Sequence, residues 1–267
     1  RKKVKVVLSG EGADELFGGY NIYLEPFARQ RLNLIPKFLR ETILRPLYES
    51  NLNFRGKNYL QRFFSKLEDR YIGNACVFNH NEIKMLWKGR VFKSFSIKPY
   101  YDSAKNLSDS TKMQFIDINT WLAGDILAKG DKMTMANSLE LRVPFLDVKI
   151  AEFASSLPDR LKFRRGTTKY LLRQAVQNIL PEPTRRRKKL GFPTPIRVWL
   201  REEQPGIFKQ IRESDYIRKN MNIDYINQII GEHISGKKDN SRKIYSLLLL
   251  SLWYSIFIEN KLDISLC

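Results

Sequence analysis

The stretch that decides the fold is Val6-Val7-Leu8-Ser9-Gly10-Glu11-Gly12-Ala13-Asp14-Glu15-Leu16-Phe17-Gly18-Gly19-Tyr20. Its apolar, β-branched start, together with Val4, predicts a buried strand over residues 4–8 that runs into a tight turn. A short helix is expected over residues 13–17, and the glycine pair that follows should end it. Open α/β sheets bind ligands at the carboxyl ends of their strands, so this turn is the first candidate for a functional site.

The turn after this strand combines backbone amides with carboxylates. Gly10 and Gly12 let amide groups approach an anion, and the N-terminus of a helix favours negative charge. Glu11, Asp14 and Glu15 would repel phosphates unless a divalent cation such as Mg²⁺ lies between them. The alternative is a capped glycine turn whose acids only stabilise the start of the helix, and the turn by itself favours that simpler interpretation.

Helical patterns dominate the rest of the chain. Apolar residues spaced three and four apart predict a long helix over residues 115–126, with Asp117 off its apolar stripe. Asp147 should cap a short helix that ends before Pro158. Another helix is expected from about Thr168 until Pro181 stops it, followed by a basic loop over residues 185–192.

The apolar segment Ile244 to Ile258 is shorter than the ~20 residues that span a bilayer, so a buried helix is expected there and no membrane partner. One strand among so many helices would be incomplete as a parallel α/β domain, because parallel strands are joined by crossovers. The sequence also begins at Arg1 rather than Met. We therefore expect a piece of a longer polypeptide, with further strands upstream.

Composition indicates a folded protein: the chain has 267 residues, of which 43% are hydrophobic. Cys76 and Cys267 are far apart and have no metal-ligand spacing, which is typical of a reducing compartment and makes the cytoplasm the expected location. No secretory signal pattern is present.

The net charge of +19 would attract phosphates, nucleic acid or anionic membranes. Thirteen Lys or Arg residues and one acidic residue, Glu182, lie between Arg160 and Arg201, so +12 of that charge lies in this segment. The segment is the candidate anion-binding region. A non-catalytic nucleic-acid-binding fragment is an alternative of another class, but it is disfavoured because aromatic residues are not interleaved with the basic run.

Four ordered blocks resemble the asparagine synthetase family, and residues 6–20 are the first. The second is Asp125-Ile126-Leu127-Ala128-Lys129-Gly130-Asp131-Lys132-Met133-Thr134-Met135-Ala136, continued by Ser138-Leu139-Glu140-Leu141-Arg142-Val143-Pro144-Phe145-Leu146-Asp147. The third is Gly166-Thr167-Thr168-Lys169-Tyr170-Leu171-Leu172-Arg173. The fourth is Arg187-Lys188-Lys189-Leu190-Gly191-Phe192 with Pro193, Pro195 and Trp199.

The resemblance implies an α/β fold of the adenine-nucleotide alpha-hydrolase-like (PP-loop ATPase) type. This truncated portion should be predominantly α-helical with one or two parallel strands. Residues 1–200 would be the C-terminal part of the synthetase domain, and residues 201–267 a C-terminal helical extension of the same domain.

The resemblance also implies a reaction. Members of the family use ATP and Mg to adenylate the side-chain carboxylate of aspartate, and ammonia then displaces AMP to give asparagine. An N-terminal glutaminase domain supplies the ammonia from glutamine. That domain and the phosphate loop of the form Ser-Gly-Gly-x-Asp-Ser are missing from this sequence, so the chain alone is expected to bind ATP weakly and to turn over negligibly. A homodimer is left open.

Family roles carry over to matching positions. Ser9 and Gly10 would bind ATP or AMP. Glu11 would act in the acyl-adenylate step, accepting a proton from incoming ammonium. Asp14 would hold Mg, shared with a missing upstream aspartate. Lys189 would be catalytic, stabilising charge on pyrophosphate.

Three further positions match the neighbourhood of the substrate pocket. Lys132 is expected to be catalytic. Glu140 and Arg142 would line the pocket, and the alternative is a buried structural ion pair between them or with other partners.

Arg185, Arg186, Arg187 and Lys188 are interpreted as a solvated basic loop. Relatives that close β-lactam rings or cyclise peptides use the same adenylation, and the order of the blocks does not separate them from asparagine formation. A split gene product that needs a second chain is another alternative.

Overall fold

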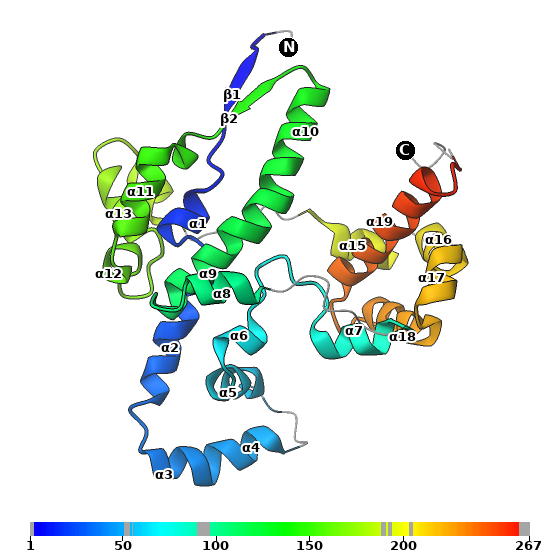
Figure 1. Cartoon of the computed structure of the whole chain (residues 1–267), viewed down its shortest axis with the longest axis horizontal. Coiled ribbons are helices and arrows are strands. Elements are labelled where there is room, and N and C mark those ends of the chain that lie inside the picture. The colour runs from blue at the N-terminus through cyan, green and yellow to red at the C-terminus, as the bar shows by residue number, and fades with distance from the viewer. Residues whose placement is uncertain are drawn as a thin grey trace. The chain divides into compact units, whose positions relative to one another are not determined.

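The computed structural model describes residues 3–50, 54, 56–89, 97–187, 191, 194–202 and 205–261 (Figure 1). The chain divides into two compact units, one formed by Arg1–Ala75 with Ser96–Lys189 and the other by Cys76–Phe95 with Leu190–Cys267. It therefore enters the second unit, returns to the first, and enters the second again. The domain boundary predicted at residue 200 partitions the chain differently and stays a prediction.

The first unit contains a short parallel sheet. Strand β1 (Val6–Leu8) pairs with β2 (Glu140–Arg142), with Val6 opposite Glu140 and Leu8 opposite Arg142. Helix α10 (Ala128–Ala136) leads into β2 and lies against it (Figure 1), so closely that a Cβ at Gly130 would come within 2.9 Å of Leu141. A mostly helical chain with one or two parallel strands is what the resemblance implied, and the structure has two.

The prediction that the first strand is buried was wrong. Val6 is 38% and Leu8 is 73% exposed. Paired residues share a face of a sheet, so Val6 and Leu8 lie on the face of Glu140 and Arg142. Helix α10 packs on the opposite face, which carries Leu141. The face that carries Val6 and Leu8 is therefore left exposed.

Helix α1 (Ala13–Phe17) begins and ends where the sequence predicted. Gly12 at its start has φ 84°, and a Cβ there would lie 2.2 Å from Leu146, so both backbone conformation and space favour glycine. Gly18 ends the helix with φ 71°. The helix buries Leu16 and Phe17 against Ala154 and Leu157, and this cluster holds the helix that follows the turn in place.

The predicted long helix is present as a continuous helical run of α9 (Asp109–Asp117), η3 (Ile118–Leu127) and α10. Its middle segment η3 is π-helical, which changes the phase of the side chains. Asp117, predicted to lie off the apolar stripe, is fully buried instead. Its carboxylate accepts hydrogen bonds from Tyr23, Tyr71 and Asn74, and these bonds compensate its burial.

Asp147 caps α11 (Val148–Ser156) by accepting a hydrogen bond from the Lys149 amide at 3.0 Å, and this helix ends before Pro158 as predicted. The helix expected from Thr168 is present as α13 (Tyr170–Ala175) but ends well before Pro181. The predicted basic loop begins inside a helix, because Arg185 and Arg186 close α14 (Glu182–Arg186).

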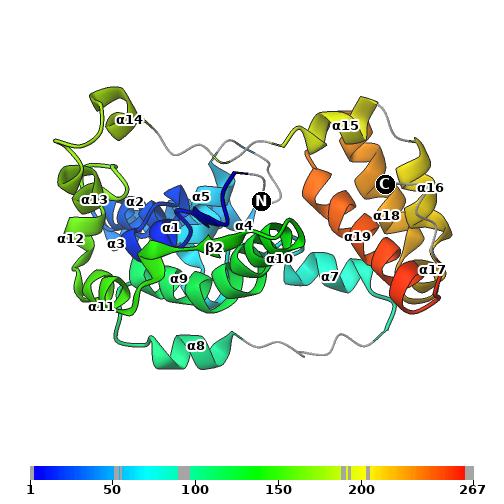
Figure 2. The same cartoon turned by 90° about the horizontal axis from the view of Figure 1, so that it is seen from above.

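The other elements of the first unit are short helices. They are η1 (Asn21–Leu24), α2 (Glu25–Leu32), α3 (Lys37–Leu39), η2 (Arg40–Leu44), α4 (Arg45–Glu49), α5 (Lys57–Phe64), α6 (Leu67–Arg70), α8 (Lys98–Ser103), η4 (Pro144–Leu146) and α12 (Asp159–Lys162). Figure 2 shows the same unit from above, with α13 and α14 next to each other.

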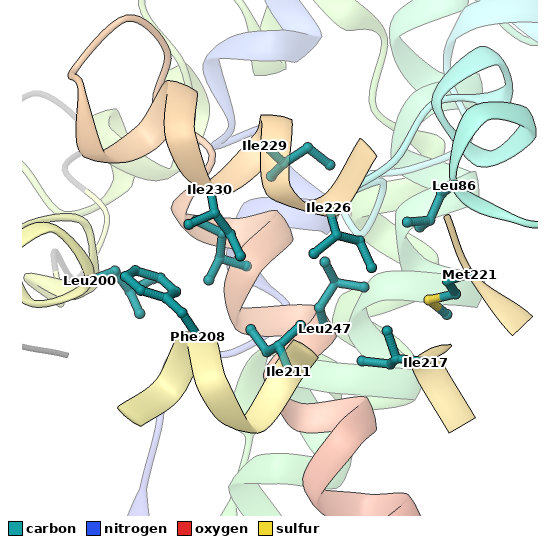
Figure 3. Close-up of a cluster of buried hydrophobic side chains, with 11 residues drawn as sticks. Leu86, Leu200, Phe208, Ile211, Ile217, Met221, Ile226, Ile229, Ile230 and Leu247 are labelled. Atoms are coloured by element: carbon teal, nitrogen blue, oxygen red, sulfur yellow. The ribbon is translucent and has the colours of Figure 1, made fainter. Parts of the chain in front are cut away.

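The second unit is helical. Its elements are α7 (His80–Leu86), α15 (Ile196–Glu202), α16 (Pro205–Glu213), α17 (Asp215–Asn220), α18 (Ile223–Ile234) and α19 (Ser241–Phe257). Aliphatic side chains from these helices converge on one core (Figure 3). Helix α7 joins it through Leu86, whose carbonyl accepts a hydrogen bond from the Asn222 amide at 2.8 Å.

The expectation of a buried helix over Ile244 to Ile258 holds for one face only. Ile244 and Leu247 of α19 are buried, whereas Trp253 is 50% and Phe257 is 67% exposed. Of the helices in the described part of the chain, none is both long and apolar enough to cross a membrane.

Candidate functional site

The turn between β1 and α1 presents unused backbone donors. The Ser9 amide donates to the Arg142 carbonyl at 2.9 Å, which holds the end of β1 beside β2. The amides of Gly10, Glu11 and Gly12 donate to no acceptor among the described residues. A Cβ at Gly10 would meet open space. Successive amides without partners at the start of a helix can bind an anion.

Glu11 supplies an acid next to these amides. Its side chain is half-buried, and its Oε2 atom is buried with no hydrogen-bond partner among the described residues. A buried polar atom without a partner loses its hydration and gains nothing in return, which costs about 1–3 kcal/mol. A bound cation or a protonated amine would satisfy it.

Asp14 faces a lysine to which the sequence assigned no role. Asp14 Oδ1 lies 3.0 Å from Lys169 Nζ, and the two side chains are mostly buried. Lys169 stands at the N-terminus of α13 with a left-handed φ of 52°. Gly19 makes room for the pair, because a Cβ there would lie 1.8 Å from Asp14 Oδ1 and 2.3 Å from Lys169 Cε. Lys169 belongs to the third sequence block, which was its only signal.

Glu15, the third acid of the turn, points into the protein. It is almost fully buried and accepts a hydrogen bond from the Tyr20 hydroxyl at 2.7 Å. Burial raises the pKa of its carboxyl group, partly offset by this hydrogen bond. Glu15 therefore supports the turn from inside rather than facing a ligand.

The buried Asp117 lies beneath the same region. The Tyr23 and Tyr71 hydroxyls donate to it at 2.5 and 2.6 Å, and Asn74 donates both its backbone amide and its side-chain amide. Burial raises the pKa of Asp117, whereas these donors act to lower it. The four hydrogen bonds fasten α9 to η1 and to the segment after α6.

Arg142 contacts the turn through its carbonyl, which accepts the Ser9 amide, but its side chain and those of Lys132 and Glu140 make no hydrogen bond or ion pair with the turn among the described residues. Lys132 is exposed on α10 and makes no hydrogen bond or ion pair with any residue that the structure describes. Arg142 and Glu140 form an ion pair of 2.8 Å, but their side chains are 62% and 55% exposed. The buried ion pair considered for them is therefore wrong, because both project from the uncovered face of β2. Lys189 lies outside the described residues.

The acidic residues of this turn could bind a metal ion only together with further ligands. Among the described residues, no group of three His, Cys, Asp or Glu side chains could hold a metal ion. Mg²⁺ is commonly bound by one or two carboxylates together with substrate phosphates and water. Asp14 and Glu11 suit that partial role.

Comparison with known proteins shows the family of the chain. The family model for asparagine synthase matches residues 1–255, which is most of its length. The chain belongs to the asparagine synthase family. It is 47% identical to the glutamine-hydrolysing asparagine synthetase 1 of Bacillus subtilis (strain 168), over 98% of this chain and 42% of that protein.

Two other relatives also match this chain over only part of their own length. A Mycobacterium tuberculosis (strain ATCC 25618 / H37Rv) protein, provisionally described as a glutamine-hydrolysing asparagine synthetase, is 43% identical over 97% of this chain and 40% of its own length. The B. subtilis asparagine synthetase 3 is 26% identical over 72% of this chain and 27% of its own. The chain thus spans about two fifths of the length of its more similar relatives. No solved structure matches it.

Proposed function

We propose that this chain is the C-terminal part of the synthetase domain of a glutamine-dependent asparagine synthetase. In that reaction ATP adenylates the side-chain carboxylate of aspartate with release of pyrophosphate, and ammonia from glutamine displaces AMP. The observation that carries the proposal is the turn after β1, where three amides and the buried Glu11 Oε2 atom have no hydrogen-bond partner within the part of the chain that the structure describes. Family membership supports the same assignment.

The residues of the turn suit separate tasks. The backbone at Ser9 and Gly10 would contact the nucleotide, because no side chain blocks Gly10. Glu11 would accept the proton that ammonium must lose before its nitrogen can attack the activated carboxyl carbon. Asp14 would help to hold Mg, which neutralises phosphate charge when bound. Lys169 would keep the Asp14 carboxylate in place.

The rest of the site would come from other parts of the polypeptide. We assign the PP-loop ATPase fold, with the phosphate loop and a second aspartate on upstream strands and a glutaminase domain before them. The chain covers only about two fifths of the length of these relatives, which supports this assignment. So does the exposure of Val6 and Leu8, which further elements of a complete domain would cover. Lys189, Lys132, Glu140 and Arg142 keep their predicted roles as proposals.

The location of the activity would be the cytoplasm. Cys76 is a free, half-buried thiol, and burial raises its pKa, so it is poorly reactive. Such a cysteine suits a reducing compartment.

The test compares Glu11→Gln with Glu152→Gln in the complete polypeptide that carries this chain. Glu152 is an exposed acid on α11, so it undergoes the same chemical change away from the turn. Glu11→Gln should lower ammonia-dependent asparagine formation by about 10²–10⁴-fold, the usual contribution of a general base. Glu152→Gln should leave it unchanged. Equal activity of the two variants would contradict the role of Glu11.

The acceptor is tested by measuring AMP formation with aspartate against a panel of β-amino acids and peptides. Aspartate-dependent AMP formation supports the proposal, whereas AMP formed only with a peptide or a β-lactam precursor would favour a ring-closing relative. The isolated 267-residue chain is the third arm. It should release no measurable pyrophosphate, and robust release would refute the hypothesis that its site is incomplete.

A further inference from the structure

A hollow of about 520 Å³ lies in the first unit, where residues of α2, η2 and α5 meet the starts of α9 and α12. We call it the α5 pocket. Its volume is that of a site for a small molecule. Its lining combines aromatic rings with five charged side chains, which are Arg29, Arg40, Glu41, Asp109 and Asp159. No residue of the turn between β1 and α1 lines it.

Most of the charge of the α5 pocket is already paired. Ion pairs account for three of its five charged side chains, in the pairs Arg29–Asp109 (3.6 Å) and Arg45–Glu41 (3.1 Å). Arg40 and Asp159 form no ion pair with any residue that the structure describes. The pocket therefore keeps one positive and one negative group for a ligand.

The positive group, Arg40, has half of its guanidinium unused. Its Nη1 donates to Asn33 Oδ1 at 3.0 Å, and the group lies 5.8 Å from the centre of the Phe63 ring. Its Nε is buried, yet neither Nε nor Nη2 donates to an acceptor within the described part of the chain. Most buried donors in native proteins are satisfied, so this one calls for a partner from outside the chain. Nε and Nη2 share one edge of the guanidinium, the edge that binds a carboxylate through two parallel hydrogen bonds.

The negative group, Asp159, is half-buried and also has spare capacity. Its Oδ1 accepts the Thr111 hydroxyl at 3.0 Å, and its Oδ2 accepts from no donor among the residues described. The Lys162 ammonium is influenced by this carboxylate, but it donates to Gln114 Oε1 at 3.1 Å instead. A protonated amine, with three donors, suits the free oxygen of Asp159.

The aromatic part of the α5 pocket consists of Phe27, Phe63 and Phe64, each half-buried. Their positions are held by contacts: Phe63 and Phe64 meet edge to face with ring centres 5.0 Å apart, and the Phe63 carbonyl accepts a hydrogen bond from Arg29 at 3.1 Å. The exposed parts of these rings favour an apolar group that leaves water on binding.

We propose that the α5 pocket binds a free amino acid with an apolar side chain. The ligand's carboxylate meets the open edge of Arg40, its ammonium group meets Asp159, and its side chain lies against the phenylalanine rings. A ligand with charge of one sign only would leave the opposite group of the pocket unpaired, and such unpaired groups are costly when partly buried. The inference does not depend on the proposed reaction.

Isothermal titration of the 267-residue chain with L-phenylalanine tests the proposal, and one site per chain is expected. Arg40→Gln and Asp159→Asn should each raise Kd at least about tenfold, because each removes one charged partner of the ligand. The matched control is Arg212→Gln. Arg212 donates to the side chain of Asn227 at 2.8 Å, much as Arg40 donates to that of Asn33, but it does not line the pocket, so Kd should change less than about twofold. Thermal melts establish that all variants fold.

Three analogues test the parts of the ligand on the unaltered chain. L-Phenylalaninamide lacks the carboxylate, N-acetyl-L-phenylalanine lacks the ammonium group, and glycine lacks the apolar side chain. Each should bind at least about tenfold more weakly than L-phenylalanine, whereas L-leucine should bind comparably.

The outcome is independent of the proposed reaction, because no titration contains ATP or aspartate and Glu11→Gln should leave the affinity for L-phenylalanine unchanged. The proposal is overturned if neither L-phenylalanine nor L-leucine binds, or if the amide or the N-acetyl analogue binds as tightly as L-phenylalanine. It is also overturned if Arg212→Gln weakens binding as much as Arg40→Gln.

Discussion

Gly19→Ala tests whether Asp14 is held where the structure places it. A Cβ at residue 19 would lie 1.8 Å from Asp14 Oδ1, whereas ordinary contact begins at 3.4 Å, so the carboxylate would have to move by about 1.6 Å. That movement breaks the 3.0 Å ion pair with Lys169. Overpacking of a filled site costs about 1–3 kcal/mol, and a partly exposed ion pair adds at most about 1 kcal/mol. We expect the free energy of unfolding to fall by about 1–4 kcal/mol.

Urea denaturation of the chain measures this change, with an unaltered m-value as the sign that the folded state is retained. Gly124→Ala is the matched control, because a Cβ there meets open space in a helical segment and should be neutral or slightly stabilising. The double variant Gly19→Ala/Asp14→Ala should recover part of the loss, because the shorter side chain removes the clash with the carboxylate and leaves only the contact with the flexible end of Lys169. A Gly19→Ala variant as stable as the Gly124→Ala control would refute the placement of Asp14.

Three further outcomes are expected. Gly10→Ala should leave the urea midpoint unchanged, because its Cβ meets open space, but should weaken ATP binding by the complete polypeptide; equal ATP affinity would argue against nucleotide contact there. Tyr23→Phe should cost about 1.5–3 kcal/mol, since it removes a donor to the buried carboxylate of Asp117, and a midpoint within error of the wild type would contradict that contact. Burial lowers the pKa of Lys162, so between that value and about 10.4 the folded chain binds fewer protons than the unfolded chain. The free energy of unfolding of the wild type should then rise with pH relative to Lys162→Met as the pH approaches about 10.4 from below, and a constant difference would count against it.

Local features of the fold were predictable from the sequence. The turn from β1 into α1 depends on neighbouring residues, and so does the Asp147 cap, which needs a carboxylate at one position. Gly12 and Gly18 mark the two ends of α1 because each adopts a positive φ. Signals of this kind lie within a few residues of the structure that they describe.

Features that depend on contacts between distant segments were not predictable. Strand β2 is only three residues long and gains its identity from pairing with β1. The burial predicted for β1 failed because burial is set by what covers a sheet, not by the strand's own composition. Asp117 shares a face of α9 with the buried Ser110, Met113 and Gln114, and because this face includes polar residues it is not marked by the apolar stripe read from the sequence.

The candidate site divides in the same way. Ser9, Gly10, Glu11 and Asp14 could be named as candidates because they lie within one short stretch of sequence, and their roles stay proposals. The pairing of Asp14 with Lys169 could not be inferred, because it joins two sequence blocks through the start of α13. Arg185 and Arg186 were interpreted as part of a solvated loop, because a run of basic residues does not reveal that these two close a short helix, α14.

The interrupted path of the chain through the second unit affects how the protein is made. Helix α7 is synthesised long before α15 to α19, yet the carbonyl of Leu86 and the amide of Lys88 bond to residues 220–222. The ribosome must therefore synthesise α15 to α19 before α7 can pack against them. Premature termination after residue 189 would leave Leu86 and Trp87 without their neighbours. Such products should be early targets for chaperones and proteases.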